Sequence, residues 1–243
     1  MKLVDIERLN LEIDGESLLK DINFYINSGE IVALAGESGS GKTLTTKFIL
    51  GILPERSIVE YERFEKNCKI GAVFQNAFTS LNPTVKIGNQ LKKIYEGHYG
   101  KNSKWEEIVI DILDKVGIKD SRGVLGKYPF ETSGGEKQRI VIAGALIGNP
   151  QLLIADEVTT ALDLKTKNEV INLFKCIQAK TGISILFISH DLEAIKGFAN
   201  RVYIMYKGKI VEENSCKEIF KNQSHPYAQK LIALSQKLWI RGE

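Results

Sequence analysis

Residues 31–43 read IVALAGESGSGKT, and the helical pattern TLTTKFIL begins at Thr43. The first five residues form an apolar run bounded by glycine, which is typical of a buried strand. Residues 36–43 match the pattern G-x-x-x-x-G-K-[ST] at every defined position, between that strand and that helix. This order predicts a phosphate-binding loop. The alternative is a glycine-rich turn that contains a lysine by chance. It does not explain why the pattern lies directly between a strand and a helix.

The chemistry of this loop suits a nucleoside triphosphate. Glycines let backbone N–H groups curl around phosphate oxygens, and the following helix presents its positive end to the same anion. Lys42 is expected to bridge the β and γ phosphates, and Thr43 to bind the Mg²⁺ that joins them. The loop alone leaves a GTPase, a kinase, a helicase and a transporter subunit open. The residues expected to contact nucleotide are Gly36, Glu37, Ser38, Gly39, Ser40, Gly41, Lys42 and Thr43.

Two adjacent acids follow a second apolar run, Leu152–Ala155. In open α/β folds ligands bind at the carboxyl ends of the strands, where Asp156 and Glu157 should lie. Successive side chains point opposite ways. Asp156 can therefore reach Mg²⁺ while Glu157 faces the γ phosphate, as general base or as the group that orients water. The alternative is an ordinary solvated pair of acids. A GTPase would not need the second acid.

His190 follows a third apolar run, Ile183–Ile188, and precedes Asp191. This position predicts that the imidazole lies at the same edge of the sheet, where it can contact the γ phosphate and the attacking water. A lone histidine is otherwise more often structural. His98 and His225 have no comparable context and are assigned no chemistry.

Apolar runs alternate with longer helical patterns along much of the chain. That alternation predicts an α/β fold with a mainly parallel sheet and helices on both faces. Two further runs, Leu3–Ile13 and Ile22–Ile26, precede it and predict strands of a separate antiparallel β lobe.

The middle and the end of the chain have distinct patterns. Residues 83–131 are polar and helical, with a loop at 101–104, and indicate an inserted helical lobe. Later, Arg201–Tyr206 and Lys209–Glu213 flank Lys207-Gly208, which predicts a hairpin. Two short helices are expected after it.

Composition restricts the classes of partner. The 243 residues are 43% hydrophobic, which allows a core without disulfide or metal staples. A net charge of +3 does not produce the strongly positive electrostatic potential that nucleic-acid binding usually needs, so no nucleic-acid partner is expected. Cys68, Cys176 and Cys216 form no C-x-x-C pair, which argues against zinc and fits a reducing compartment. The longest apolar stretch, Ile140–Gly148, has about half the length of a membrane-spanning helix, so other subunits would cross any membrane.

A second anion cradle is predicted at residues 133–136, ahead of a long helix expected at Lys137–Ile147. Its glycines free backbone N–H groups, its serine adds a hydroxyl, and the helix dipole points at the bound group. In this motif, SGGEKQR, the chain resembles the ATP-binding cassette (ABC) family. The resemblance implies a P-loop NTPase of the ABC ATPase type, in which one subunit closes over ATP held by the phosphate loop of another. The residues implied in that closure are Ser133, Gly134, Gly135 and Glu136.

The resemblance runs nearly end to end. Gln75 matches the family's Q-loop, Ala161-Leu162-Asp163 matches the D-loop, which crosses to the partner subunit, and Ser189-His190-Asp191 matches the switch histidine. Residues 1–243 are thus interpreted as one nucleotide-binding domain, with a catalytic core and β lobe at 1–82 and 132–243 and a helical lobe at 83–131. The implied catalytic residues are Glu157, His190 and Gln75, the implied Mg²⁺ ligands are Thr43, Gln75 and Asp156, and Asp163 is implied at the nucleotide.

Within the family, FTSLNP at 78–83 and HPYAQ at 225–229 are similar to patterns of the peptide and nickel importers. That group implies a peripheral subunit at the cytoplasmic face of the cell membrane. Its implied partners are an identical or sister ATPase, permease subunits and, indirectly, an extracellular or periplasmic solute-binding protein. Residues 44–54 and 128–131 look more like nickel than dipeptide ATPases. The expected cargo is nickel or a peptide, with a metal chelate as alternative.

Two other hypotheses stay open at this point: a soluble ABC ATPase without a transport role, and a weakly hydrolysing partner of a sister ATPase. The second rests on departures from the family pattern. Val158 stands where the family has proline after the acid pair, which removes a rigid turn. Ile13 stands where an aromatic residue would stack on adenine. Thr132 replaces the leucine that usually begins the signature, with little expected effect.

Overall fold

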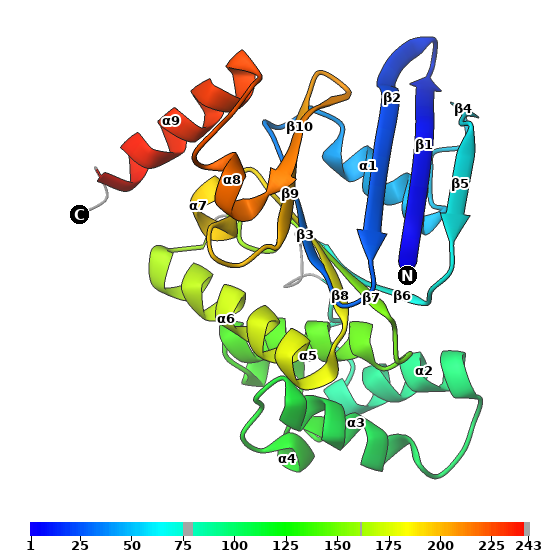
Figure 1. Ribbon diagram of the computed structural model, residues 1–243. Coiled ribbons are helices and arrows are strands. Elements are labelled where there is room, and N and C mark those ends of the chain that lie inside the picture. The colour runs from blue at the N-terminus through cyan, green and yellow to red at the C-terminus, as the bar shows by residue number, and fades with distance from the viewer. Residues whose placement is uncertain (75–79, 161, 241–243) are drawn as a thin grey trace.

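Within residues 1–74, 80–160 and 162–240, which the computed structural model describes, a six-stranded sheet forms the centre of the molecule (Figure 1). Its order is β10-β9-β3-β8-β7-β6, and neighbouring strands are parallel except in the β9–β10 hairpin. The predicted mainly parallel sheet is confirmed. Its strands are β3 Ile31–Ala35, β6 Ile70–Val73, β7 Leu152–Asp156, β8 Ser184–Ser189, β9 Arg201–Tyr206 and β10 Lys209–Ser215.

A second, antiparallel sheet confirms the predicted β lobe. Strand β1 (Lys2–Ile13) pairs with β2 (Glu16–Asn27) and, on its other edge, with β4 (Ser57–Glu60) and β5 (Arg63–Lys66). Strand β2 begins six residues before the predicted Ile22, because its first half alternates with polar residues and carries little apolar signal. The pattern also did not reveal β4 and β5, which are short and largely exposed.

The central strand β3 is buried on both faces, which explains its uninterrupted apolar sequence. Val32 and Leu34 face a core shared with the antiparallel sheet and with Phe48 of helix α1 (Lys42–Leu50). The alternate residues, including Ala33, face a second core that contains residues of α5 (Gly134–Leu146) and α6 (Leu164–Thr181). The end of this strand is therefore rigid where the phosphate loop begins.

Helices fill residues 83–131, as predicted, and lie together at one end of the molecule (Figure 1). The predicted loop at 101–104 separates the first two of them. Of the two helices expected at the C-terminus, the second is long rather than short. The elements are α2 Ile87–Tyr99, α3 Trp105–Lys115, α4 Ser121–Leu125 and a 3₁₀ turn at Pro129–Glu131, then α7 Leu192–Ile195, α8 Cys216–Ile219 and α9 Pro226–Ile240. Among the described residues, no helix combines the length and apolar character needed to cross a bilayer.

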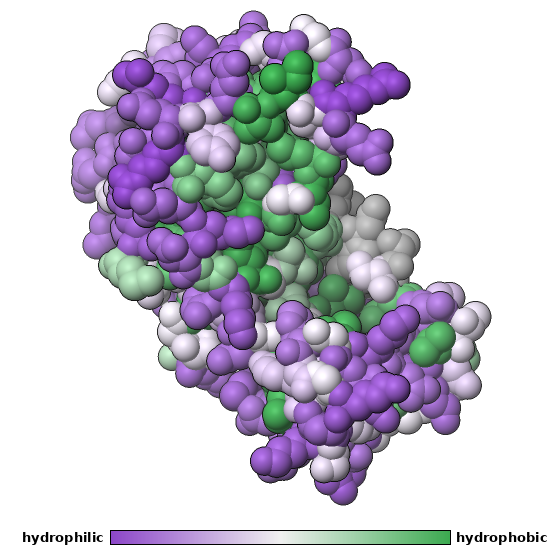
Figure 2. Space-filling view, turned by 90° about the vertical axis from the view of Figure 1, so that its right-hand side faces the viewer, coloured by the Kyte–Doolittle hydropathy of each residue, from purple (hydrophilic) through white to green (hydrophobic). Residues whose placement is uncertain are grey.

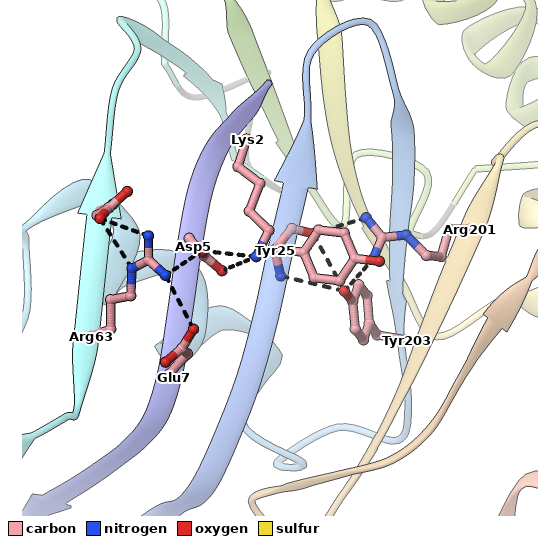
Figure 3. Close-up of polar contacts among 8 residues, drawn as sticks. Lys2, Asp5, Glu7, Tyr25, Arg63, Arg201 and Tyr203 are labelled. Atoms are coloured by element: carbon pink, nitrogen blue, oxygen red, sulfur yellow. Dashed lines mark hydrogen bonds and ion pairs between the residues drawn. The ribbon is translucent and has the colours of Figure 1, made fainter.

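Arg201 ties the two sheets together (Figure 3). Its guanidinium donates two hydrogen bonds of 2.8 Å to the Glu30 carboxylate and one of 2.8 Å to Glu213. It also donates to the Tyr203 hydroxyl and to the backbone oxygen of Tyr25 on β2, and it lies 3.7 Å from the Tyr25 ring centroid. This buried cation thus joins β9 to the antiparallel sheet.

The pKa values in this network follow from its charges. Burial alone would lower the pKa of Arg201, but Glu30 and Glu213 raise it overall. Burial would raise the pKa of Glu30, whereas hydrogen bonds from Arg201 and from the Asn27 amide lower it below the ordinary 4.5. A carboxylate with a lowered folded-state pKa stabilises the fold above its unfolded-state pKa and loses that contribution as the pH falls through the folded-state value.

We predict that Arg201→Met destabilises the fold by about 3–5 kcal/mol, because it leaves the Glu30 carboxylate buried without its partner. Urea denaturation at pH 7 measures the change. The difference from the unmodified protein should shrink as the pH falls below 4.5. Arg56→Met is the control, since the Arg56–Asp14 pair is exposed, and it should change stability by no more than about 0.5 kcal/mol. Equal effects of the two variants would contradict the role of Arg201.

Candidate functional site

The phosphate loop lies between β3 and α1, as predicted, and its glycines are required by space as well as by backbone angle. Gly36, Gly39 and Gly41 have positive φ angles of 151°, 79° and 110°. A Cβ added at Gly36 would lie 2.3 Å from the Met205 backbone oxygen, and one at Gly41 would lie 2.6 Å from Leu19 Cδ2. The loop is therefore packed tightly against β2 and β9, so side chains at these two glycines have no room.

Lys42 is buried beneath this loop, with 3% of its surface exposed. Its Nζ donates hydrogen bonds of 2.8 Å to the backbone oxygens of Gly36 and Glu37 and lies 3.8 Å from Glu157 Oε1. Burial lowers the pKa of Lys42, although the nearby carboxylates of Glu157, Asp156 and Glu37 oppose this effect. The ammonium group is thus held in place with an incomplete set of countercharges.

Thr43 and Asp156 meet at the end of β7. The Thr43 hydroxyl lies 3.4 Å from Asp156 Oδ1, longer than the roughly 2.5–3.0 Å of a full O–H···O hydrogen bond. Asp156 is 3% exposed, and burial raises its pKa, while the Thr43 hydroxyl partly opposes the shift. A hydroxyl and a buried carboxylate are the hard oxygen donors that Mg²⁺ prefers, so these two residues fit the predicted metal position.

Glu157 directly follows β7 in a left-handed backbone conformation, with a φ angle of 51°. Its backbone N–H donates to Ile188 of β8, and its carboxylate accepts from Thr160 and lies 3.9 Å from His190 Nδ1. Lys42 and His190 thus approach the same carboxylate from different strand ends. A left-handed conformation is costly for a residue other than glycine, so these contacts are needed to hold Glu157 in place.

A cavity of about 370 Å³ opens at this point. Loop residues, Lys42, Thr43 and Glu157 line it, as predicted, and Leu18, Leu44 and Lys47 line it without having been predicted as site residues. Ile13, the expected neighbour of the adenine ring, is not among the lining residues and packs partly buried in the core of the antiparallel sheet. The cavity is lined by Leu18, Ser38, Gly39, Gly41, Lys42, Thr43, Leu44, Lys47 and Glu157.

The second predicted cradle is the first turn of α5 rather than a segment ahead of it, because Ser133 caps the helix and Gly134 is its first residue. Ser133 and Glu136 form a reciprocal capping box: the Ser133 hydroxyl accepts from the Glu136 N–H, and the Glu136 carboxylate accepts from the Ser133 N–H. These bonds lower the pKa of Glu136. Ser133, Gly134 and Gly135 are exposed and do not line the cavity, so they are not part of this chain's own phosphate loop site.

The remaining predicted residues have different outcomes. Asp163 caps α6, accepting hydrogen bonds from the Thr166 N–H and hydroxyl, which lower its pKa. It does not line the cavity. Gln75 lies outside the described residues, so its predicted position stays a prediction. Thr132 is buried and donates to the Pro129 backbone oxygen, which is compatible with its expected packing role.

Val158, where the family has proline, is also buried, and its backbone oxygen accepts from the Gln138 side chain of α5 at 3.2 Å. The Thr160 N–H donates to the Glu157 backbone oxygen across the same turn. These bonds hold the turn after Glu157 without proline. The sequence singles out Gln138 only as part of SGGEKQR, so its contact with the turn could not be read from spacing.

Comparisons with known proteins agree with this geometry. A model of the family described as ABC transporter matches residues 19–160, from β2 to the turn after Glu157. A Brucella ovis protein named for peptide import and ATP binding is 40% identical over 238 residues, which cover 88% of this chain and 70% of that protein. The oligopeptide transport ATP-binding protein OppD of Bacillus subtilis is 38% identical over 245 residues, covering 93% of this chain and 68% of OppD.

A solved structure shows the same fold. The protein cbiO1 from Clostridium perfringens, part of the ABC transporter complex cbiONQ, matches with a TM-score of 0.77 and 27% identity, over 90% of each chain. The similarity is not confined to the phosphate loop, because it covers 90% of each chain.

We predict that Gly36→Ala destabilises the protein more than Gly39→Ala, by about 1–3 kcal/mol, because only the first methyl group meets a fixed backbone oxygen. Gly39 is the matched control: it also has a positive φ angle, but nothing lies within 4 Å of an added Cβ. Chemical denaturation without nucleotide measures both. Equal losses would show that backbone conformation, and not close packing against Met205, requires glycine at position 36.

Proposed function

The chain belongs to the ABC transporter family, and from this premise we propose that it is the ATPase subunit of a peptide importer, working as one half of a nucleotide-sandwiching dimer. Members of the family bind ATP, and the chain is an ATPase coupled to transport. The observation that carries the proposal is that Lys42, Thr43 and Glu157 line one cavity, with Asp156 beside Thr43 at its base. Their contacts supply a phosphate ligand, a metal ligand and a base within one site.

In the proposed reaction, Lys42 keeps its hydrogen bond to the Gly36 carbonyl, gives up the one to the Glu37 carbonyl and bridges the β and γ phosphates. Glu157 orients a water molecule for in-line attack on the γ phosphorus and accepts its proton. His190, half exposed beside Glu157, contacts the γ phosphate and that water. Gln75 is proposed to sense the metal and the water. The charge that develops on the γ oxygens is stabilised by Lys42 and by the N-terminal end of α1.

Mg²⁺ is proposed to bind Thr43 and Asp156, with Gln75 as a further ligand. It would supply positive charge that neutralises the β and γ phosphate oxygens. Thr43 and Asp156 meet at the observed 3.4 Å without a full hydrogen bond, which supports their use as ion ligands.

The exposure of Ser133–Gly135 supports the dimer. A helix N-terminus with free N–H groups is a good anion site. Because it lies outside this chain's own nucleotide cavity, we propose that it closes over ATP bound to a facing subunit, which is either identical or a sister ATPase. Glu136 holds the serine in place through the capping box, and Asp163 at the start of α6 lies in the crossing D-loop.

Membrane partners are proposed for an apolar groove of the surface, and Figure 2 shows that apolar side chains gather on one face of the molecule between more polar regions. A groove of about 240 Å³ lies between β6, α2 and α5, and Phe74 and Ile94 at this groove are 40% and 39% exposed. We propose that permease subunits dock here, with the chain at the cytoplasmic face of the membrane and a solute-binding protein on the other side. Residues 1–243 would act as one nucleotide-binding domain, with 83–131 as the lobe that transmits the motion.

Peptide is the proposed cargo. The relatives described above are named for peptide import and oligopeptide transport, whereas the expected nickel cargo finds no support in those names.

The alternative of a weakly hydrolysing partner is less well supported, since the Val158 turn is held by other hydrogen bonds and Glu157 stays beside Lys42. Within residues 1–74, 80–160 and 162–240, no feature favours the alternative of a soluble ATPase without a transport role.

Glu157→Gln should bind ATP with a Kd within about twofold of the unmodified protein, yet hydrolyse it at least about 100-fold more slowly, because the amide cannot accept the proton. The variant should accumulate as an ATP-loaded dimer in analytical ultracentrifugation. Glu169→Gln, on the exposed face of α6, is the control and should retain full activity. Normal turnover by Glu157→Gln would remove Glu157 from the mechanism.

Lys42→Ala should weaken ATP binding by at least about tenfold, since charge-assisted hydrogen bonds contribute roughly 1.5–3 kcal/mol each. Isothermal titration calorimetry measures the Kd. Lys209→Ala removes an exposed lysine from β10 and should leave the Kd unchanged. ATP affinity that survives Lys42→Ala would contradict the phosphate loop assignment.

The cargo is tested by purifying the complex from membranes in mild detergent and identifying the permeases and binding protein that accompany this chain. We expect the binding protein to retain peptides, detected by mass spectrometry of its eluted ligand. Stoichiometric nickel without peptide would overturn the proposed cargo while leaving the ATPase assignment intact.

A further inference from the structure

One peptide unit of the phosphate loop is hydrogen-bonded on both sides. Its carbonyl, Gly36 C=O, accepts a 2.8 Å hydrogen bond from Lys42 Nζ. Its amide, Glu37 N–H, donates a 3.1 Å hydrogen bond to the hydroxyl of Tyr227 on α9. A trans peptide is planar, and its N–H and C=O point in opposite directions. Tyr227 and Lys42 therefore form hydrogen bonds with opposite edges of the same planar peptide unit, although they are 185 positions apart in the sequence.

Tyr227 is itself firmly placed. Its ring stacks on Tyr206 at the end of β9, with centroids 4.0 Å apart and an angle of 23° between the planes. Its N–H donates to His225 Nδ1 at 3.1 Å. The Glu212 carboxylate of β10 accepts from the N–H groups of Ser224 and His225. The start of α9 is thus attached to the β9–β10 hairpin before it reaches the phosphate loop.

The same hairpin holds the loop at a second point. The N–H of Gly208 in its turn donates to the Ser40 backbone oxygen at 3.0 Å, and the Gly208 oxygen accepts from the Lys20 N–H at 2.8 Å. Contacts from the C-terminal part of the chain therefore meet the loop both at its first peptide and at Ser40. Only the first of these contacts uses a side-chain hydroxyl, and only that one leads directly to Lys42.

We propose that Tyr227 is a positioning residue for nucleotide binding, which acts on Lys42 through the Gly36–Glu37 peptide. A hydrogen bond to a peptide N–H strengthens the acceptor power of the carbonyl in the same unit. It also fixes the direction of that carbonyl, and with it the place of the Lys42 ammonium. Burial raises the pKa of Tyr227, so the hydroxyl stays protonated at neutral pH. The inference rests on the proposed role of Lys42 as phosphate ligand.

Tyr227→Phe tests this inference, because it removes the hydroxyl and keeps the stacked ring. The Kd for ATP should rise about 3- to 10-fold, which corresponds to one hydrogen bond. The KM for ATP should rise in parallel, with kcat within about twofold, since Glu157 and His190 do not contact the phenol. Hydrogen–deuterium exchange at the Glu37 amide should accelerate, which reports the lost bond directly.

Tyr206→Phe is the matched control. It removes a hydroxyl from the other ring of the same stack, for which the described part of the chain shows no hydrogen-bond partner. Its Kd and its Glu37 exchange rate should not change. If both variants weaken ATP binding equally, the effect comes from docking of α9 in general, and the inference about the Tyr227 hydroxyl is wrong.

The proposed function and this inference fail separately. Lys42→Ala with undiminished ATP binding would overturn the proposed function, whatever Tyr227→Phe does. Lys42→Ala with weakened binding, together with unchanged Kd and KM in Tyr227→Phe, would overturn only the inference. Weakened binding in both Lys42→Ala and Tyr227→Phe, with Tyr206→Phe unaffected, supports it.

Discussion

A lysine ammonium that is 3% exposed controls the architecture of this site. An unpaired buried cation costs more free energy than a fold of this size can tolerate, so Lys42 needs acceptors on every accessible side. The first two are carbonyls of its own loop, which turn inward only because glycines occupy the positive-φ positions. Negative charge is added at the end of β7 by Glu157, whose Oε1 lies 3.8 Å from the Lys42 Nζ, and by Asp156.

The parallel sheet is what brings those groups together. Register pairs Ala35 of β3 with Ser189 of β8, and Asp156 of β7 with Ile188 of β8, so the three strands end side by side. Whatever follows each strand is presented at one edge: the phosphate loop after β3, Glu157 after β7 and His190 after β8. Burial of β3 on both faces keeps this edge rigid. Arg201 holds the antiparallel sheet beside the parallel one through its hydrogen bond to the Tyr25 backbone oxygen.

Local sequence predicted what local geometry determines. The glycine spacing of the loop, the acids after a buried run and the histidine after the next one were readable because each is set by a few consecutive residues. Leu18, Gly208 and Tyr227 were not readable as site residues, since their contacts with the loop depend on how β2, the hairpin turn and α9 pack in three dimensions. The strands β4 and β5 were missed because each is only four residues long and largely exposed. The start of α5 was predicted too late in the sequence, because a capping box lets the two glycines join the helix.

The electrostatics of the site favour ligand binding. Burial lowers the pKa of Lys42 and raises that of Asp156, so desolvation outweighs their attraction to neighbouring charges in both cases. Each group is therefore less stable in its charged form here than in water, although the two charges have opposite signs. Under the proposed function, a bound triphosphate would offer Lys42 an anion, and a divalent cation would offer Asp156 a positive charge. Part of the affinity for such a complex would then come from relieving the desolvation cost of these two groups. Because Ser133–Gly135 is exposed and outside this chain's own cavity, the proposed function takes the final ligand of the γ phosphate from another subunit, and closure of the proposed dimer would then depend on the bound nucleotide.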